Sequence, residues 1–500
     1  MKAATDKVDG TRPRSWQLVM LVQSMLFAML LLFAILFSLF EQHPEGFIYP
    51  VCVFLLILFA WTLWSWRALT GNLFDPYILF MLSAFMFNAG LAFLEIFHLN
   101  KGGLFEGVFS RQTILETLFL VTICLTAFHS GALIAIFIRY RKGRTSAATQ
   151  KQEQDGRPLR LVGWGLICIA AIPTVLLLRN YISVVISSGY IGLYQQQFST
   201  GFGAWPRVFS AFLVPGTLFL LAGSKGKKSG IFGSLGIMLF YCAVMLFLGA
   251  RAGVIMPLVA YFWLWHRVIH KIPKVALVSA AMLILLVLVP LLPYFRTASG
   301  HERYSITRTV DEYFSIENPA LAGLTDMGGS MRTVSYTIDL VPETRGYDMG
   351  ASYYYALLTV FPNAFWSIHP SMARGIASEW LVQTVDPEAA RMGAGIGYSF
   401  IAEAYLNFGW WGAPIVLILM GFLFGSLVLW ADRSGDIARL AMVASFLSFF
   451  LVFPRGESIL VVRALVWYSA LPYLAVRFIG RRSSRCPTNA ESLVAGSLLS

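Results

Sequence analysis

The chain has 500 residues, of which 57% are hydrophobic and 13% are charged, with a mean hydropathy of +0.68 and a net charge of +12. A soluble globular protein would carry about 25% charged residues, so this composition excludes a soluble enzyme or binding module. Apolar runs near 20 residues indicate membrane helices, because only helices and closed barrels satisfy their backbone hydrogen bonds in lipid. We therefore expect an all-α polytopic membrane protein.

Twelve apolar runs predict about twelve transmembrane helices. They cover residues 16–40, 47–66, 77–98, 113–138, 161–178, 205–222, 231–248, 253–266, 275–294, 405–430, 437–453 and 459–479. The first run is too long for a signal-peptide core, so we interpret it as a retained anchor. The run at 253–266 is short and contains Pro257, which suggests a tight hairpin around the GARAG turn at 249–253.

These runs divide the chain into nine helices at 1–295, a long loop at 296–404, three helices at 405–480 and a tail at 481–500. Connections as long as the 296–404 segment are usually functional or disordered. Disorder is not expected here, because the stretch Ser352–Trp366 is aromatic and apolar. We expect short helices in this segment that fold over the bundle as a lid.

Lysine and arginine are distributed unevenly over the short loops. With the N-terminus inside, the inner segments hold 22 basic residues and the short outer loops hold 5. The positive-inside rule therefore predicts cytoplasmic termini and an outer location for the 296–404 segment. The same distribution explains the net charge of +12 without a nucleic-acid partner.

Three arginines are expected at the outer interface, namely Arg251, Arg296 and Arg455. A guanidinium group presents a planar fork of donors that matches phosphate oxygens two at a time. Their convergence on one rim predicts a pyrophosphate site. The alternative is that each of them extends to lipid headgroups or pairs with a loop carboxylate.

The stretch GIGYSFIAEAYLNFGWWG at 395–412 begins the tenth predicted helix. Ser399, Glu403 and Asn407 are spaced by four residues, so they share one helix face. Partial burial would prepare Glu403 as a general base, whereas an ion pair with a neighbouring arginine is the structural alternative. Phosphate-loop and zinc motifs are absent from the sequence, so we expect no metal and no cofactor.

The chain resembles Wzy-type O-antigen polymerases, also called oligosaccharide repeat unit polymerases. The motifs that carry the resemblance are G-x-G-Y-S-x-I-A-E-A-Y-L-N-F-G-x-x-G at 395–412, FPNAFWSIHP at 361–370, GAR at 249–251 and PRG at 454–456. One departure concerns Asn363, where the family pattern leads us to expect a basic residue. A phosphate-binding role at that position is therefore not expected.

The resemblance implies a GT-C-like bundle with one long periplasmic loop, in the inner membrane of a bacterium. It implies transfer of a growing glycan from undecaprenyl pyrophosphate to a new lipid-linked repeat unit, in contact with membrane lipids and a chain-length regulator protein. The expected catalytic residues are Glu403 and Arg296. The expected substrate contacts are Arg251, Arg455, Arg374, His369, Asn407 and Tyr398.

Two other functions are compatible with this sequence. An O-antigen ligase, which transfers finished glycan to the lipid A core, shares the bundle and the long outer loop. A transporter or flippase of lipid-linked oligosaccharides would place polar groups near the bilayer midplane, often in two related halves. Here the charged candidates gather at one rim and no half resembles the other, which favours the enzyme.

Overall fold

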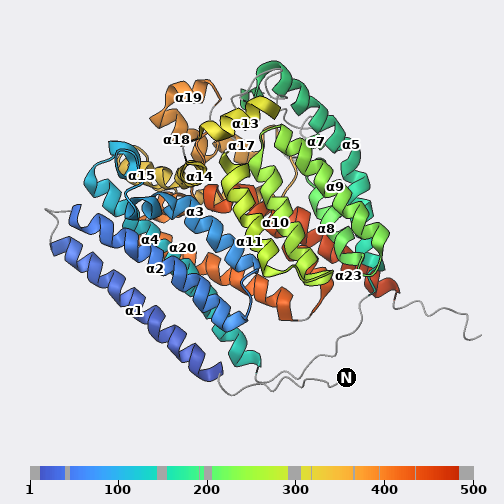
Figure 1. The fold of residues 1–500 in the computed structure, drawn as a ribbon, viewed down its shortest axis with the longest axis horizontal. Helices are drawn as coiled ribbons and strands as arrows, with labels where there is room; N and C mark the ends of the chain where they lie inside the picture. The colour runs from blue at the N-terminus through green and yellow to red at the C-terminus, as the bar shows by residue number, and fades with distance from the viewer. Residues whose placement is uncertain are drawn as a thin grey trace, which may run out of the picture.

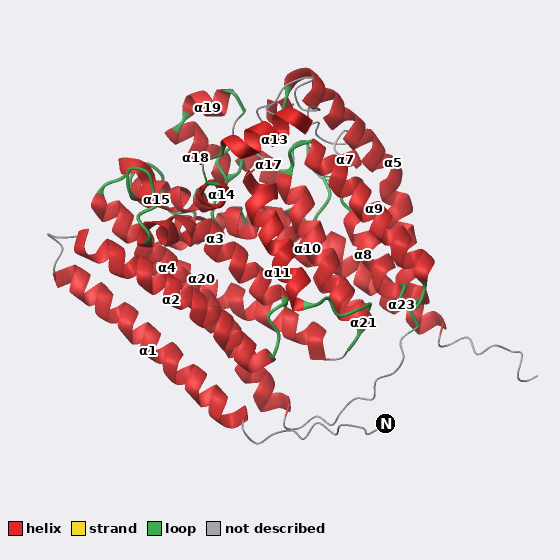
Figure 2. Ribbon diagram, in the orientation of Figure 1, coloured by secondary structure: helices red, strands yellow, loops and turns green. Residues whose placement is uncertain are grey.

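The computed structural model describes residues 12–39, 45–143, 155–190, 192–195, 205–290, 306–316, 318–363, 366–393, 395–433 and 435–483. Within these ranges every secondary-structure element is a helix (Figure 2). The long helices run side by side in one bundle, and shorter helices gather at one end of it (Figure 1). The expected all-α polytopic architecture is confirmed.

The long helices follow the apolar runs of the sequence. Before residue 296 the helices that form in these runs are α1 Arg12–Leu39, α2 Glu45–Thr70, α3 Pro76–Ile96, α4 Arg111–Gly143, α5 Arg157–Ser188, the short α7 Trp205–Ser210, α8 Leu213–Gly223, α9 Lys228–Phe247, α10 Arg251–Val268 and α11 Lys274–Leu283 with the π-helical η3 Ile284–Leu288. The short elements η1 Leu104–Gly107 and α6 Gly192–Gln195 lie in loops. The last helices are α20 Phe400–Arg433, α21 Ile437–Phe450, η5 Phe453–Arg455, α22 Ile459–Arg463, η6 Ala464–Ala470 and α23 Leu471–Ser483.

Ten helices of the described residues are long and apolar enough to cross a membrane, against about twelve expected. The difference lies in the runs 253–266 and 275–294. The first forms α10, which carries a charged residue near each end, Arg251 and Arg267, and contains Pro257. The second forms an apolar helix at Lys274–Val287, and its predicted last residues lie outside the described ranges. Both runs are therefore helical, but neither meets the length and hydropathy of a full span.

The most extensive helix contact in the bundle is between α4 and α20. Its closest points are two glycines, because a Cβ on Gly131 would overlap the carbonyl oxygen of Ile418 and one on Gly421 would overlap that of Phe128. Small residues allow helix backbones to approach in lipid, where association depends on van der Waals packing. This contact holds α20, and with it the 395–412 motif, firmly in the bundle.

Residues 306–400 cover one end of the bundle, which we call the loop end; the opposite end is the far end. Their helices are α13 Ile306–Ser315, α14 Pro319–Gly328, α15 Ser330–Leu340, α16 Ala351–Leu358, α17 Pro370–Arg374, α18 Ala377–Val385 and α19 Pro387–Arg391. α14 packs on α3, α15 packs on α4 and α20, and α16 packs on α22. Polar contacts add to this packing: the Thr113 hydroxyl donates to Asp339 at 2.8 Å, and Arg332 pairs with Glu106 at 2.7 Å.

Candidate active site at the loop end

The 395–412 motif contains a break in α20 at Gly409, where φ is +63° and ψ is −159°. Glycine adopts this conformation without the steric cost that a side chain would bring. Two carbonyl groups before the break accept hydrogen bonds from the long loop. The Asp348 N–H donates to Leu406 O at 2.9 Å, and the Met349 N–H donates to Asn407 O at 3.0 Å. The break is therefore a docking point for residues 348–349.

The Glu403 carboxylate is 1% exposed and joins three segments of the chain. The Ser352 hydroxyl donates to its Oε1 at 2.8 Å, the Ser458 hydroxyl donates to Oε1 at 2.6 Å, and the Ser458 N–H donates to Oε2 at 2.8 Å. Asn407 Nδ2 donates to Ser352 Oγ and to Glu403 O, both at 2.7 Å. Glu403 and Asn407 thus lie on one helix face, as their spacing predicts, and they attach α16 and α22 to α20.

The alternative of an ion pair does not describe Glu403. Within the described ranges its carboxylate makes no salt bridge to a lysine or arginine. Hydroxyl and backbone donors hold it instead, and a carboxylate that accepts such bonds in a buried place is well satisfied. In this conformation both carboxylate oxygens already accept hydrogen bonds, from Ser352 and Ser458.

Ser399 and Tyr398, just before α20, are also buried. The Ser399 hydroxyl donates to Asn88 Oδ1 at 2.5 Å, and Asn88 Nδ2 donates to Pro454 O at 3.0 Å. The Tyr398 hydroxyl lies 3.1 Å from Thr337 Oγ1, and its side chain is 1% exposed. In this conformation Tyr398 packs between helices, and it does not present its ring to a glycan.

The Arg455 side chain crosses Gly397 and lies over Phe87, with its Cζ 5.8 Å from the ring centroid. A Cβ on Gly397 would overlap Nε and Cγ of Arg455, whereas Gly395 has no atom within 4 Å of its ideal Cβ. The arginine therefore requires glycine at 397 but leaves 395 free. Two motifs that are nearly 60 residues apart in the sequence form one structure here.

A second buried carboxylate, Glu457, precedes Ser458 directly. Its two oxygens accept the N–H groups of Ala377 at 2.9 Å and of Ser378 at 2.8 Å, so it caps the first turn of α18. Burial raises the pKa of Glu457, and these two N–H groups oppose the shift. The loop between α21 and α22 thus binds both α20 and α18 through adjacent residues.

Arg345 and Arg374 converge on Asp348 in the long loop. Arg345 Nη2 lies 3.0 Å from Asp348 Oδ1, and Arg374 pairs with Oδ2 of the same carboxylate. Each guanidinium also covers an aromatic ring, with 4.6 Å from Arg345 Cζ to the Trp380 centroid and 5.0 Å from Arg374 Cζ to the Tyr355 centroid. Two cations share one anion, so this cluster keeps a net positive charge beside the Gly409 break.

His369 is 7% exposed and lies at the start of α17. Its Nδ1 accepts the Ser371 N–H at 3.2 Å and lies 2.7 Å from the Ser371 hydroxyl. An acceptor Nδ1 places the proton of the neutral ring on Nε2. That Nε2 is buried and has no hydrogen-bond partner in the described ranges. The Trp366 ring covers His369 edge-on, with the centroids 5.2 Å apart.

Of the three arginines expected to form one cluster, Arg251 and Arg455 are described, and both belong to the loop end. Arg251 begins α10 and makes an ion pair with Asp326 of α14. Arg455 makes the separate contacts given above. Arg296 lies outside the described residues. The shared pyrophosphate site that the sequence suggests therefore stays a prediction.

Sequence reasoning missed six residues of this site, and most of their partners are far away in the chain: Asn88, Arg345, Asp348, Ser352, Glu457 and Ser458. Four of them carried a signal. Glu457 and Ser458 follow Arg455 in FPRGES, a polar stretch between two apolar runs, and Arg345 is three residues before Asp348. Nothing in the sequence pairs Ser352 with Glu403, because only the fold brings α16 to α20.

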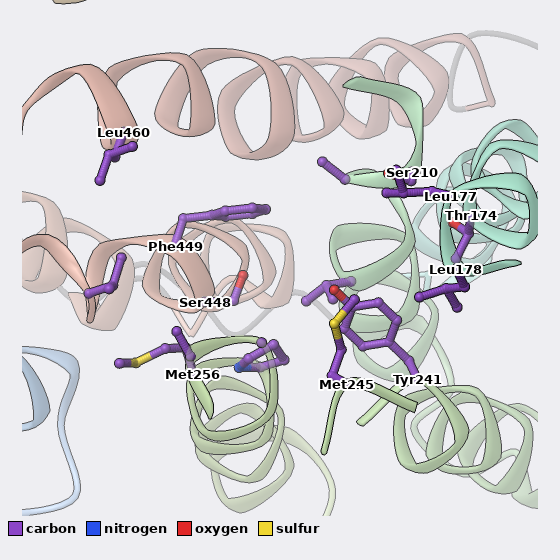
Figure 3. Close-up of a pocket in the computed structure, with 16 residues that line it drawn as sticks. Thr174, Leu177, Leu178, Ser210, Tyr241, Met245, Met256, Ser448, Phe449 and Leu460 are labelled. Atoms are coloured by element: carbon purple, nitrogen blue, oxygen red, sulfur yellow. The ribbon is translucent and has the colours of Figure 1, made fainter. Parts of the chain in front are cut away.

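An apolar cavity of about 360 Å³ lies between α5, α8, α9, α10 and α21, close to the loop end (Figure 3). Leu177 and Leu178 of α5, Met245 of α9, Met256 of α10 and Phe449 of α21 line it. In the described ranges no group of three or more His, Cys, Asp or Glu is arranged to hold a metal ion.

Comparison with known proteins gives one result that spans most of the chain. The family model for the O-antigen polysaccharide polymerase Wzy matches residues 20–484. No curated protein and no solved structure matches the chain. The match includes the bundle, the loop end and the 395–412 motif, and it agrees with the resemblance drawn from the motifs. The chain therefore belongs to the O-antigen polysaccharide polymerase Wzy family.

Proposed function

We propose that this protein polymerises lipid-linked oligosaccharide repeat units. It transfers the growing glycan from undecaprenyl pyrophosphate to a new repeat unit, itself linked to undecaprenyl pyrophosphate. In the reaction an acceptor hydroxyl oxygen bonds to the anomeric carbon, the bond from that carbon to pyrophosphate oxygen breaks, and the hydroxyl proton leaves to a base. The observation that carries the proposal is the family match over residues 20–484.

The reaction takes place at the loop end, which we assign to the periplasmic face of a bacterial inner membrane. The support is the charge distribution, with 22 basic residues in the segments on the other side against 5 in the short loops on this side. Both termini are then cytoplasmic. The partners are lipid-linked oligosaccharides, membrane lipids and a chain-length regulator protein, and neither a nucleic acid nor a cofactor is needed.

The arginines of the loop end bind pyrophosphate in this proposal. Arg251 and Arg455 hold the phosphates of the lipid carriers, Arg296 stabilises the charge on the leaving pyrophosphate, and Arg374 and His369 contact the substrate nearby. Stabilisation of a developing anion by fixed donors is commonly the largest catalytic contribution. Glu403 and Asn407 act as positioning residues, because their hydrogen bonds to Ser352 and Ser458 attach α16 and the start of α22 to α20.

Deletion of the gene followed by complementation tests the function. A glycolipid gel that collapses from a ladder to a single repeat unit on the lipid A core identifies a polymerase. Loss of all glycan from the core identifies a ligase instead and overturns the proposal.

A complementing Arg251→Lys variant tests the arginine. Lysine keeps the charge toward Asp326 but lacks the two-pronged donor, so the ladder should be lost at unchanged protein level. A normal ladder from this variant would refute two-pronged binding of phosphate at this position.

A further inference from the structure

Parts of the wall of the apolar cavity are adjacent in the sequence to the loop-end arginines. Ala252 and Gly253 line it, and they follow Arg251 directly in the first turn of α10. Val452 and Leu460 line it from the other side, and Arg455 lies in the loop between them. The segments that carry both described arginines of the proposed phosphate site are therefore walls of this cavity.

The lining of the cavity is suited to a hydrocarbon. Half of its lining residues are leucine, methionine, valine or phenylalanine (Figure 3). Two of its hydroxyl groups are bonded within their own helices, Ser448 to Ser445 O at 2.7 Å and Ser210 to Arg207 O at 3.0 Å. A third, Thr174 Oγ1, is buried without a hydrogen-bond partner in the described ranges. None of the lining residues is charged, so a charged ligand would lose its hydration in this cavity without an ionic partner.

We propose that this cavity binds the isoprenoid chain of a lipid-linked pyrophosphate substrate, with the pyrophosphate at Arg251 and Arg455. The inference rests on the function proposed above and adds the place of the lipid. A molecule with an apolar tail joined directly to a doubly charged diphosphate matches an apolar cavity whose walls end in guanidinium-bearing turns. Because the tail comes from the bilayer and not from water, its binding in the cavity gains mainly packing contacts. The isoprenoid tail therefore positions the substrate in the cavity, and the arginines recognise the charge of its phosphates.

Met245 offers a sharp perturbation, because it lines the cavity from α9 and is not part of the polar network around Glu403. Met245→Trp fills the cavity with a larger ring. Phe240→Trp is the matched control on the same helix, because Phe240 is 70% exposed on the outside of the bundle. Both proteins are purified full-length in lipid nanodiscs, and their thermal stabilities are compared first.

The first measurement uses undecaprenyl pyrophosphate that carries a diazirine in its isoprenoid chain. Photolabelling followed by peptide mass spectrometry should place the label on α5, α9 or α10 in the wild type and in Phe240→Trp. Met245→Trp should reduce this label at least tenfold. Unlabelled undecaprenyl pyrophosphate should compete, whereas phosphatidylglycerol should not. Label elsewhere in the chain, or competition by phosphatidylglycerol alone, would overturn the inference.

The second measurement separates this inference from the proposed function. Polymerisation is measured with repeat units on the C55 carrier and on a C10 prenyl pyrophosphate. The wild type should prefer the long carrier, and Met245→Trp should lose at least tenfold in kcat/KM for the long carrier with little change for the short one. Polymerisation that is intact and equally selective in Met245→Trp would reject the cavity while leaving the polymerase function in place. An inactive wild type with both carriers would reject the function itself.

Discussion

The role of Glu403 can be decided by exchanging its carboxylate for a carboxamide. In Glu403→Gln the amide oxygen can accept the Ser458 N–H, and the NH₂ group then faces the hydroxyls of Ser352 and Ser458, which can rotate to accept. The geometry is kept, so we expect a loss of about 1 kcal/mol of stability, typical of one weakened hydrogen bond. In Glu403→Ala three buried donors lose their acceptor at about 1 to 3 kcal/mol each, so a loss of at least about 3 kcal/mol is expected.

Activity separates the two possible roles. A positioning residue that acts through hydrogen bonds should leave Glu403→Gln within about tenfold of the wild-type rate, whereas removal of a general base typically costs about 10² to 10⁴ in rate. The assay is the initial rate of glycan extension in nanodiscs, measured together with thermal melting. Glu388→Gln, an exposed exchange of the same kind in α19, is the control. A hundredfold slower Glu403→Gln protein with unchanged melting temperature would refute the positioning role and identify the carboxylate as the base.

Three further predictions concern other positions. Gly397→Ala should reduce polymerisation at least tenfold by displacing Arg455, whereas Gly395→Ala, with open space around its Cβ, should be active; equal ladders from both would contradict the Arg455 packing. Gly409→Ala should lower the melting temperature, because a side chain at φ +63° and ψ −159° costs about 1–3 kcal/mol and its Cβ would lie 3.1 Å from the Tyr347 ring. Gly236→Ala in α9, with open space around its Cβ, should not. Burial raises the pKa of Asp75 at the far end to about 7. Between its pKa in the unfolded chain and this value, the folded chain therefore binds a proton that the unfolded chain has lost. The free energy of unfolding should therefore fall as the pH rises from about 4 to about 7, by at most about 1.4 kcal/mol per pH unit. In Asp75→Asn the melting temperature should depend less on pH over that range. A pH dependence equal to that of the wild type would contradict the raised pKa of Asp75.

The hydrogen bonds around Glu403 show which features of the site helix periodicity predicts and which it does not. Spacing by four residues correctly places Glu403 and Asn407 on one face, because an α-helix returns to the same side after 3.6 residues. It does not identify what that face meets. Ser399, on the same predicted face, bonds to Asn88 of α3, while Glu403 bonds to Ser352 and Ser458. The break at Gly409 was also not predicted, since a glycine within an apolar helix is compatible with a straight helix as well as with a break.

The sequence by itself determined the membrane class, the helical architecture and the family, because hydrophobic length and short motifs are local properties of the chain. It also selected Arg251, Arg455 and Glu403 as residues of one end of the bundle. Only the tertiary structure decided their partners: Asp326 for Arg251, Gly397 and Phe87 for Arg455, and two serines for Glu403. The apolar cavity beside the arginines likewise exists only in the fold. The reason is that hydrogen bonds, ion pairs and cavities depend on contacts between segments that are tens to hundreds of residues apart, whereas helix formation in lipid is settled within each segment by its own backbone hydrogen bonds.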